Sequence, residues 1–414
     1  MAVDTLRLEE FGNLLLVRVR TDEGLSGLGE TFFGPLAVEA YLHETAAPYL
    51  LGRDPLDVEA HAHALRGHLG YSGTGAETRG RSAVDIALWD LLGKATGQPL
   101  YRLLGGRVHD RVRLYNTCAG PGYVRSGGQS TANWGLPGDD SPTTPGRYED
   151  LDAFLHRAGE LALDLREQGI TGMKIWPFDP YAEASAGTYL SPRQLAEGLR
   201  PFELIREAVG DDMDVMLELH SLWDLPAARR IARAVEDYRP FWFEDPVRAD
   251  DLDALAAFAA GTRVPVTASE TLAGRRAFRD LLARRAAGVV MLDVSWCGGL
   301  GEARAIAGMA AAHSLPVTPH DCTGPVVLTA STHLAVHAPN TLVAEFVRAS
   351  YYGWYRELVT QLPPVVDGHI GPPPGPGLGT DLQPDVWRRP DAVVRTSGAA
   401  IPSSPRLSSW LPWR

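Results

Sequence analysis

A regular alternation of short apolar runs with longer amphipathic segments constrains the fold of this chain more than any other feature. The short runs are rich in β-branched and aromatic residues, and several longer segments follow a Ser or Asp, which favours a helix N-terminus. Such alternation is typical of parallel strands joined by crossover helices. We predict strands at 112–118, 172–178, 215–220, 241–246, 264–270, 289–296, 316–321 and 342–346. Eight such units over about 240 residues favour an α/β fold of the (β/α)8 TIM-barrel type over an open sheet.

The segments on either side of the barrel have a different pattern. Residues 1–111 contain a hairpin-like apolar pair over 14–30, with glycines at the turn, and a helical stretch at 81–97. Residues 356–414 are rich in Pro and Gly, which favours an extended segment. We therefore expect an α+β capping domain at 1–111, a catalytic barrel at 112–355 and a C-terminal segment that returns to the cap.

Net charge and cysteine content exclude several classes of function. The net charge is −12 and no long Lys or Arg run is present, so the chain lacks a basic surface for nucleic acid or an anionic membrane. No signal core or membrane-spanning apolar stretch occurs in the sequence. Cys118, Cys297 and Cys322 form an odd set without CxxC spacing, which favours reduced thiols in the cytoplasm. We expect a cytoplasmic enzyme, and an anionic substrate would need cations placed locally in its site.

Titratable side chains stand at the ends of the later predicted strands. From Glu218 onward they recur every 23 to 27 residues, which is one strand-helix unit each, so they converge at one mouth of the barrel. Any one of them alone could be a solvated loop residue or a helix cap, but a set in register indicates a site. The residues are Lys174, Glu218, His220, Glu244, Glu270, Asp293, His320 and Glu345.

Three of these residues are carboxylates on consecutive strands and predict a metal site. Glu218, Glu244 and Glu270 would raise one another's pKa in a buried pocket unless a cation neutralised them. Oxygen ligands suit Mg²⁺ or Mn²⁺, whereas Zn²⁺ would recruit Cys and His. Asp245 competes with Glu244, but it precedes Pro246 and fits better as a residue outside the ligand set.

The order of these motifs resembles the enolase superfamily, in its mandelate racemase-like subgroup. The resemblance rests on the runs ELH, FEDP, ASE, LDVSWCGG and PHDCTGP at these spacings, and on the cap segment 81–106. It extends over nearly the whole chain to about residue 382. It implies a capped barrel in which three strand-end acids hold Mg²⁺ and a His or Lys base forms an enolate; this chemistry of the superfamily is established.

The resemblance also implies a role for each remaining residue. His320 would remove the proton next to a substrate carboxylate, and Asp293 would hydrogen-bond its other ring nitrogen. Lys174 and Mg²⁺ would hold the resulting enolate, and Glu345 would contact the substrate carboxylate. His220 resembles the general acid of sugar-acid dehydratases, which protonates the departing β-hydroxyl.

Two departures from the family pattern carry information. Racemases of this subgroup have a second lysine two residues after the first, where this chain has Trp176, so a two-base racemase is disfavoured. The first metal ligand is usually Asp, where this chain has Glu218. The sequence therefore favours an acid-sugar (aldonate or aldarate) dehydratase that yields a 2-keto-3-deoxy acid and forms homo-oligomers, as capped barrels commonly do.

Three alternatives remain open at this stage. A cycloisomerase or epimerase would share the fold and the base. A metal-dependent barrel hydrolase is less favoured, because the run 112–118 lacks the HxH pair expected on its first strand. A sugar-acid-binding relative without activity is the third. Substrate specificity is expected to come from the cap loop 24–34, from the long loop 119–147 acting as a lid, and from Trp176, Trp223 and Trp296.

Overall fold

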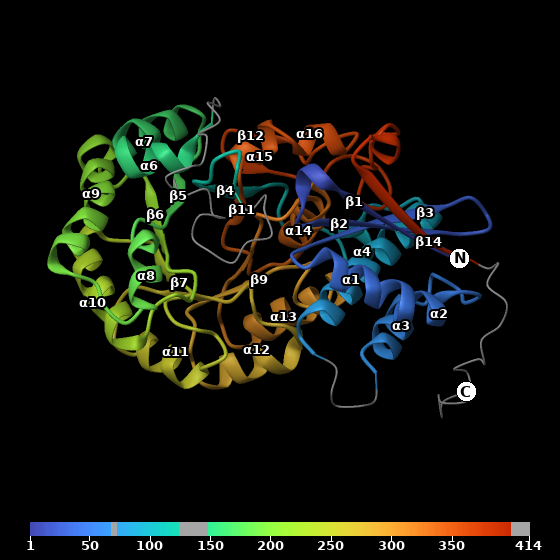
Figure 1. Cartoon of the computed structure of the whole chain (residues 1–414), viewed down its shortest axis with the longest axis horizontal. Coiled ribbons are helices and arrows are strands. Elements are labelled where there is room, and N and C mark those ends of the chain that lie inside the picture. The colour runs from blue at the N-terminus through green and yellow to red at the C-terminus, as the bar shows by residue number, and fades with distance from the viewer. Residues whose placement is uncertain (68–72, 124–147, 399–414) are drawn as a thin grey trace.

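Eight parallel strands follow one another around a ring (Figure 1). The computed structural model describes residues 1–67, 73–123 and 148–398. The strands are β4 (Val112–Thr117), β5 (Gly172–Ile175), β6 (Asp214–Glu218), β7 (Trp242–Glu244), β8 (Val266–Ala268), β9 (Val289–Leu292), β10 (Val317–Pro319) and β11 (Ala344–Phe346). The ring closes because β11 pairs with β4, and because Val317 bonds backbone groups of Asn340 and Leu342 just before β11, each at 2.9 Å. The prediction of an eight-stranded barrel is confirmed.

Several predicted strands run too far at their C-terminal ends. The run 215–220 was expected to be extended throughout, but β6 ends at Glu218. His220 and Ser221 have φ values of 46° and 59°, so the backbone turns into the left-handed region directly after the strand. Glu218 and His220 are therefore not alternate residues of one extended strand. Their proximity comes from the turn, in which the backbone N of His220 donates to Glu218 Oε1 at 2.6 Å.

Helices cover the outside of the ring and begin where the sequence provides caps. Ser191 Oγ accepts from Gln194 N at 3.2 Å, Asp224 from Ala227 N at 3.0 Å, and Asp251 from Ala254 N at 2.9 Å. The helices are α6 (Asp150–His156), α7 (Ala158–Glu167), α8 (Asp179–Ser185), α9 (Pro192–Val209), α10 (Leu225–Val235), α11 (Leu252–Ala259), α12 (Gly274–Ala283), α13 (Leu300–Ala312), α14 (Pro325–His337), α15 (Arg348–Tyr352) and α16 (Tyr355–Leu358).

Large side chains fill the interior of the barrel below its mouth. Tyr115, Met216, Trp242, Met291 and Val343 form one buried cluster, in which the Tyr115 and Trp242 rings meet edge to face with centres 5.3 Å apart. The ring is therefore a packed core and not a pore. Lys174, Glu218, Glu244 and Glu345 lie in or at the ends of their strands, above this cluster.

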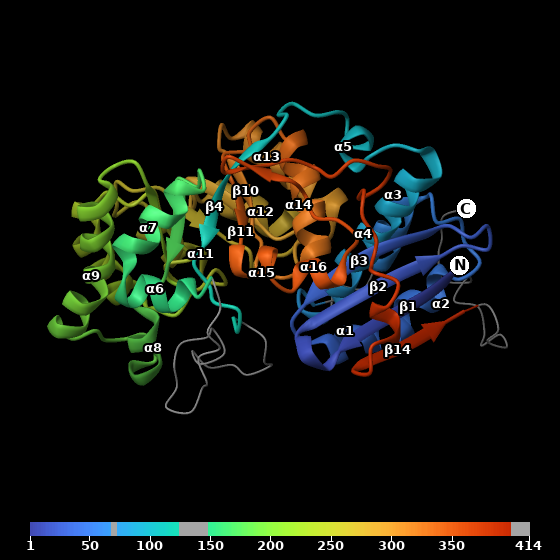
Figure 2. The same ribbon diagram turned by 90° about the horizontal axis from the view of Figure 1, so that it is seen from above.

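The capping domain is an antiparallel sheet with helices beside it (Figure 2). Its strand order is β14-β1-β2-β3, so the C-terminal strand β14 pairs with β1. Helix α4 approaches β3 closely at Gly27 and Gly29, where an added Cβ would lie within 2 Å of helix carbonyl oxygens. The elements are β1 (Ala2–Leu8), β2 (Leu14–Arg20), β3 (Ser26–Phe32), α1 (Pro35–Tyr41), α2 (Ala47–Leu50), α3 (Val58–Leu65), α4 (Ala76–Thr96), α5 (Leu100–Leu103) and β14 (Ala392–Ser397).

Two buried carboxylates of the cap hold the N-termini of barrel helices. Glu30, in β3, accepts from the backbone N of Val327 at 3.0 Å and of Val326 at 3.3 Å, in the first turn of α14. Asp85, in α4, accepts from Gly301 N at 3.2 Å in the first turn of α13. The capping domain therefore supplies the N-terminal hydrogen-bond acceptors that these two barrel helices lack in their own sequence.

Some expectations lie beyond what the structure tests. The predicted lid, 119–147, falls almost entirely outside the described residues. The domain boundaries at residues 111 and 355 stay predictions. In the described ranges, no helix is long and apolar enough to cross a membrane.

Candidate active site

The ammonium group of Lys174 joins three of the predicted site residues at the barrel mouth. Lys174, in β5, is buried, and its Nζ lies 2.8 Å from Glu345 Oε1 and 3.3 Å from Glu218 Oε2. It also contacts Glu244 Oε1. Burial alone would lower the pKa of Lys174, but the carboxylates of Glu244 and Glu345 raise it well above its ordinary value. Lys174 therefore remains a cation that binds side chains from three other strands.

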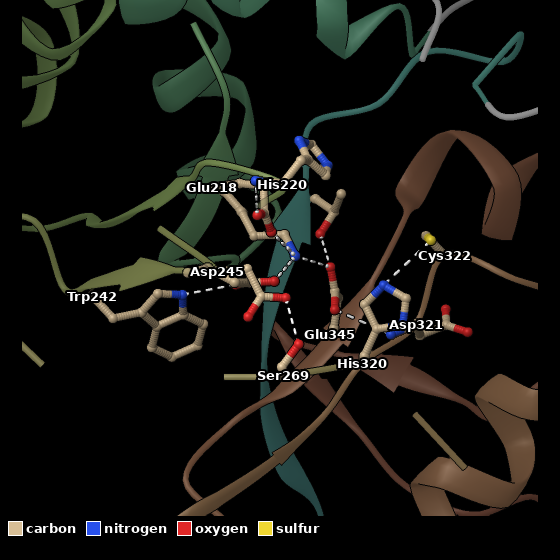
Figure 3. A network of polar contacts seen from close by, with 12 residues as sticks. Glu218, His220, Trp242, Asp245, Ser269, His320, Asp321, Cys322 and Glu345 are labelled. Carbon is tan, nitrogen blue, oxygen red and sulfur yellow. Dashed lines mark hydrogen bonds and ion pairs between the residues drawn. The ribbon is translucent and has the colours of Figure 1, made fainter. Parts of the chain in front are cut away.

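Glu345 lies between Lys174 and His320 and is held as a charged group. Thr117 Oγ1, at the end of β4, donates to its Oε1, and the backbone N of Asp321 donates to its Oε2 at 3.1 Å. Burial would raise the pKa of Glu345, yet Lys174 and His320 lower it below its usual range. Figure 3 shows Glu345 near the centre of the network, with His320 and Cys322 on one side and Glu218 on the other.

His320 and Asp293 form a buried pair. His320 follows β10, and its Nδ1 lies 2.7 Å from Asp293 Oδ2, just beyond β9. The other oxygen, Asp293 Oδ1, accepts from the backbone N of Ser295 at 2.6 Å and from its Oγ at 2.7 Å. Burial would lower the pKa of His320, but Cys322, Glu345 and the bond to Asp293 raise it well above its ordinary value. The carboxylate fixes the tautomer and leaves Nε2 directed away from Asp293.

A second His–Asp pair, which the sequence did not reveal, lies on the other side of the network. His220 Nδ1 is 2.6 Å from Asp179 Oδ2, and Asp179 is fully buried at the start of α8. Burial would lower the pKa of His220, but Glu218 and Asp179 raise it. The His220 ring also meets the Trp176 ring edge to face, and its Nε2 lies 3.4 Å from the hydroxyl of Tyr123. The carboxylates of Glu218 and Asp179 favour the protonated form of the His220 ring.

The three predicted metal ligands fall into two groups: Glu218 lies beside Glu244, and Glu270 lies beside Asp245, a residue expected outside the ligand set. Glu218 Oε1 accepts from the backbone N of Leu219, and Glu244 Oε2 from the Trp242 indole, each at 2.9 Å. Burial would raise the pKa of Glu218, but His220 and Lys174 lower it below its ordinary value. Burial and the negative charge of Glu218 raise the pKa of Glu244 well above its ordinary value. In the second pair, Asp245 lies beside Glu270 and accepts from Ser269 Oγ at 2.8 Å.

The second pair retains the capacity to bind a cation. Asp245 Oδ1 and Glu270 Oε2 are buried and have no hydrogen-bond partner in the described part of the chain. Burial and the neighbouring Glu270 raise the pKa of Asp245 well above its usual range. Two such carboxylates in contact fit an oxygen-preferring divalent cation. Among the residues that the structure describes, no three Asp, Glu, His or Cys side chains are grouped so that they could hold a metal ion.

The three tryptophans named from the sequence are buried, and two of them lie against the site histidines. Trp176 is enclosed by the rings of Tyr123, Phe154 and His220, with centres 5.2 to 5.6 Å away. Trp296 lies against His320, with ring centres 5.2 Å apart. None of the indole nitrogens of Trp176, Trp223 and Trp296 has an acceptor within the described ranges.

Sequence reasoning missed Asp179, Thr117 and the contact between Asp245 and Glu270. Asp179 could have been found, because it stands directly after the predicted strand 172–178, as the other site residues stand after theirs. Thr117 carries no such signal, since hydroxyl side chains are common in strands. The pairing of Asp245 with Glu270 depends on the loop backbone, where Asp245 has a φ of 38°.

Comparison with known proteins identifies the family. Residues 1–105 match the mandelate racemase/muconate lactonizing enzyme N-terminal domain, and residues 157–386 match the enolase C-terminal domain-like family. An enolase of the mandelate racemase subgroup from Agrobacterium tumefaciens is 51% identical, with a TM-score of 0.85 over 96% of this chain and 98% of that one.

Curated relatives of this chain are enzymes. A D-galactonate dehydratase of Ralstonia nicotianae is 30% identical over 92% of this chain and 95% of its own. A D-xylonate dehydratase of Haloferax volcanii is 29% identical over 90% of this chain and 84% of its own. The matches confirm the resemblance read from the motifs: this chain belongs to the mandelate racemase/muconate lactonizing enzyme family of the enolase superfamily.

Proposed function

We propose that this protein is a Mg²⁺-dependent acid-sugar dehydratase, a lyase that converts an aldonate or aldarate into a 2-keto-3-deoxy acid. Relatives over nearly the whole chain are named D-galactonate and D-xylonate dehydratases. The observation that carries the proposal is the presence of two His–Asp pairs, on either side of the Lys174 network. Dehydration needs a base for the α-proton and an acid for the β-hydroxyl, and each pair can supply one of these groups.

His320 is the proposed base. In the neutral ring, with Nδ1 bonded to Asp293, Nε2 can accept the proton from the carbon next to the substrate carboxylate. Lys174 provides a cation for the two oxygens of that carboxylate as negative charge develops on them. Glu345, fixed between Lys174 and His320, orients both groups.

His220 is the proposed acid. Hydroxide is a poor leaving group, so loss of the β-hydroxyl at neutral pH needs a proton donor within hydrogen-bond reach. Asp179 and Glu218 favour the protonated ring, which suits this role. The proton from the ring and the β-oxygen then leave as water, and the enol product tautomerises to the keto acid.

Glu218, Glu244 and Glu270 are the proposed ligands of Mg²⁺, with Asp245 beside them. Mg²⁺ bound there would neutralise these carboxylates and stabilise negative charge on the substrate carboxylate. Mn²⁺ fits the same oxygen donors. The partly unsatisfied pair of Asp245 and Glu270 supports this assignment.

The experiment is a turnover assay with Mg²⁺ on a panel of aldonates and aldarates. Formation of a 2-keto-3-deoxy acid from at least one of them is the expected result. Recovery of an epimer or a cycloisomer instead would favour the isomerase alternative, and binding without turnover would favour a sugar-acid-binding protein.

A further inference from the structure

A basic side chain of the capping domain lies beside the proposed base and has no role in the chemistry above. Arg79 is in the first turn of α4. Its guanidinium carbon lies 5.2 Å from the centre of the Trp296 ring and 5.9 Å from that of Phe33, in the cap loop. The Trp296 ring in turn lies 5.2 Å from the His320 ring. Arg79 is therefore separated from His320 by a single aromatic side chain.

The charge of Arg79 lacks a local counterion. Among the residues that the structure describes, Arg79 contacts the two aromatic rings and interacts electrostatically with Asp293, but it makes no hydrogen bond or ion pair. Asp293 attracts it electrostatically, but the oxygens of Asp293 are bonded to His320 and Ser295. The buried Arg348, by contrast, bonds both oxygens of Asp150 at 2.6 and 2.7 Å. A half-buried guanidinium without an anion is costly, and burial lowers the pKa of Arg79.

A second unused donor lies next to Arg79. The Trp296 side chain is 7% exposed, and its Nε1 has no acceptor in the described segments. Buried indole N–H groups usually have a hydrogen-bond partner. The planar, positively charged guanidinium of Arg79 and the indole N–H of Trp296 are thus two neighbouring hydrogen-bond donor groups. This combination suits a carboxylate, which can accept two parallel bonds from a guanidinium.

We propose that Arg79 binds a second carboxylate at the end of the substrate remote from the reacting one, so that the substrate is an aldarate and not an aldonate. The inference rests on the proposed function, which places the reacting carboxylate at Lys174. One cation then stands at each end of a row of neighbouring residues, which runs from Lys174 through Glu345, His320 and Trp296 to Arg79. In a protein of net charge −12, a doubly charged substrate needs such locally placed cations.

The test compares hexonic and hexaric acids that share the same stereochemistry at their carbinol carbons. The parent enzyme is expected to prefer the hexarate in kcat/KM by about 10²-fold, the range of a bond between charged groups. Arg79→Met should lower kcat/KM for the hexarate by a similar factor and change that for the hexonate by less than about 3-fold. Arg79→Lys, which keeps the charge but not the fork, should lie between them.

A binding measurement separates this inference from the proposed function. Calorimetric titration of Mg²⁺-loaded His320→Asn protein, which cannot abstract the proton, should show hexarate binding that the further change Arg79→Met weakens about 10²-fold. Arg81→Met is the matched control on the same helix, because Arg81 lies two positions on, bonds Thr78 at 2.6 Å, and faces away from Arg79. It should leave hexarate binding unchanged, and melting temperatures verify that each variant is folded.

The outcomes are distinct. If the parent turns over no acid sugar at all, the proposed function is wrong. If the parent turns over hexonates as well as hexarates and Arg79→Met affects both equally, only the role of Arg79 is wrong. A preference for a 6-phosphohexonate over the hexarate would also overturn the aldarate assignment.

Discussion

Each imidazole at the barrel mouth is held by one buried carboxylate, which engages one of its two ring nitrogens. For His320 this carboxylate is Asp293, and for His220 it is Asp179. In both pairs Nδ1 is engaged at short distance, whereas Nε2 makes a longer contact of 3.4 Å, to Cys322 Sγ in His320 and to the Tyr123 hydroxyl in His220. Nε2 is therefore the nitrogen proposed for proton transfer. The two rings are then distinguished by their neighbours: Glu345 and Cys322 beside His320, and Glu218 beside His220.

His320→Asn should lower keto-acid formation by on the order of 10² to 10⁴-fold, the usual contribution of a positioned base. Asp293→Asn should lower it less, because the ring remains but its orientation and tautomer are no longer fixed. Steady-state rates on the substrate found by the panel assay are the measurement. Normal rates in both variants would show that this pair is not the base.

Asp179→Asn should lower product formation by about 10 to 10²-fold if Asp179 acts through His220. In a double-mutant cycle, Asp179→Asn should then have little further effect once His220 is Asn, because the residue it positions is gone. Independent, multiplicative effects of the two changes would contradict this coupling.

At the residue scale, the regular register of strand ends predicted where most candidate side chains lie. Lys174, Glu218, Glu244 and Glu345 come together because their strands end at one mouth. What the sequence could not supply is the conformation of the turns that follow. The left-handed backbone at His220 and Asp245, and the burial of Asp179, depend on packing between segments far apart in the chain.

At the scale of elements, the junction of cap and barrel depends on buried carboxylates at helix N-termini. Burial raises the pKa of Glu30 to about 8 and that of Asp85 to about 7, although both accept backbone hydrogen bonds. These bonds hold the cap on α14 and α13, next to the site. No local sequence pattern predicts them, because each joins residues more than two hundred positions apart.

Glu30 makes the stability of the protein depend on pH. Its folded pKa of about 8 lies above the unfolded value of about 4.3, so the folded state binds an extra proton between these values. The stability that Glu30 contributes is fully present below pH 4.3 and is lost as the pH rises through 8. Glu30→Gln, which resembles the neutral acid, should match the parent melting temperature near pH 5 and exceed it by roughly 5 °C at pH 8.5.

The matched control is Glu207→Gln, which changes an exposed carboxylate on α9. Its melting curves should follow those of the parent at both pH values. Parallel pH dependence of Glu30→Gln and the parent would contradict the assignment to Glu30.

At the scale of the whole molecule, the hydrophobic periodicity was sufficient to predict a capped barrel. Period-two apolar runs and capped amphipathic helices are local features, so they can be read from one sequence. The return of the C-terminal strand β14 to β1 was anticipated only as an extended segment that returns to the cap, because partner choice between strands is set by long-range packing. The placement of Arg79 against Trp296 could not be predicted from the sequence either, because it too is set by long-range packing.

The whole site should depend on a divalent cation. Exhaustive chelation is expected to abolish turnover, and Mg²⁺ or Mn²⁺ to restore it, because the carboxylates at the mouth exceed the charge that Lys174 neutralises. Glu244→Gln should lose Mg²⁺ binding in a calorimetric titration while its melting curve remains cooperative. Full activity after chelation would exclude the metal site.

The division of proton transfer between two imidazoles is tested most directly by His220→Asn with the true substrate in D₂O. Removal of the α-proton needs His320, whereas loss of the β-hydroxyl also needs an acid. The variant should therefore retain part of any α-hydrogen exchange and still bind Mg²⁺, while keto-acid formation falls by about 10²-fold or more. Keto-acid formation at the parent rate would show that His220 is not the acid, and the assignment of a dehydratase mechanism to these two pairs would be wrong.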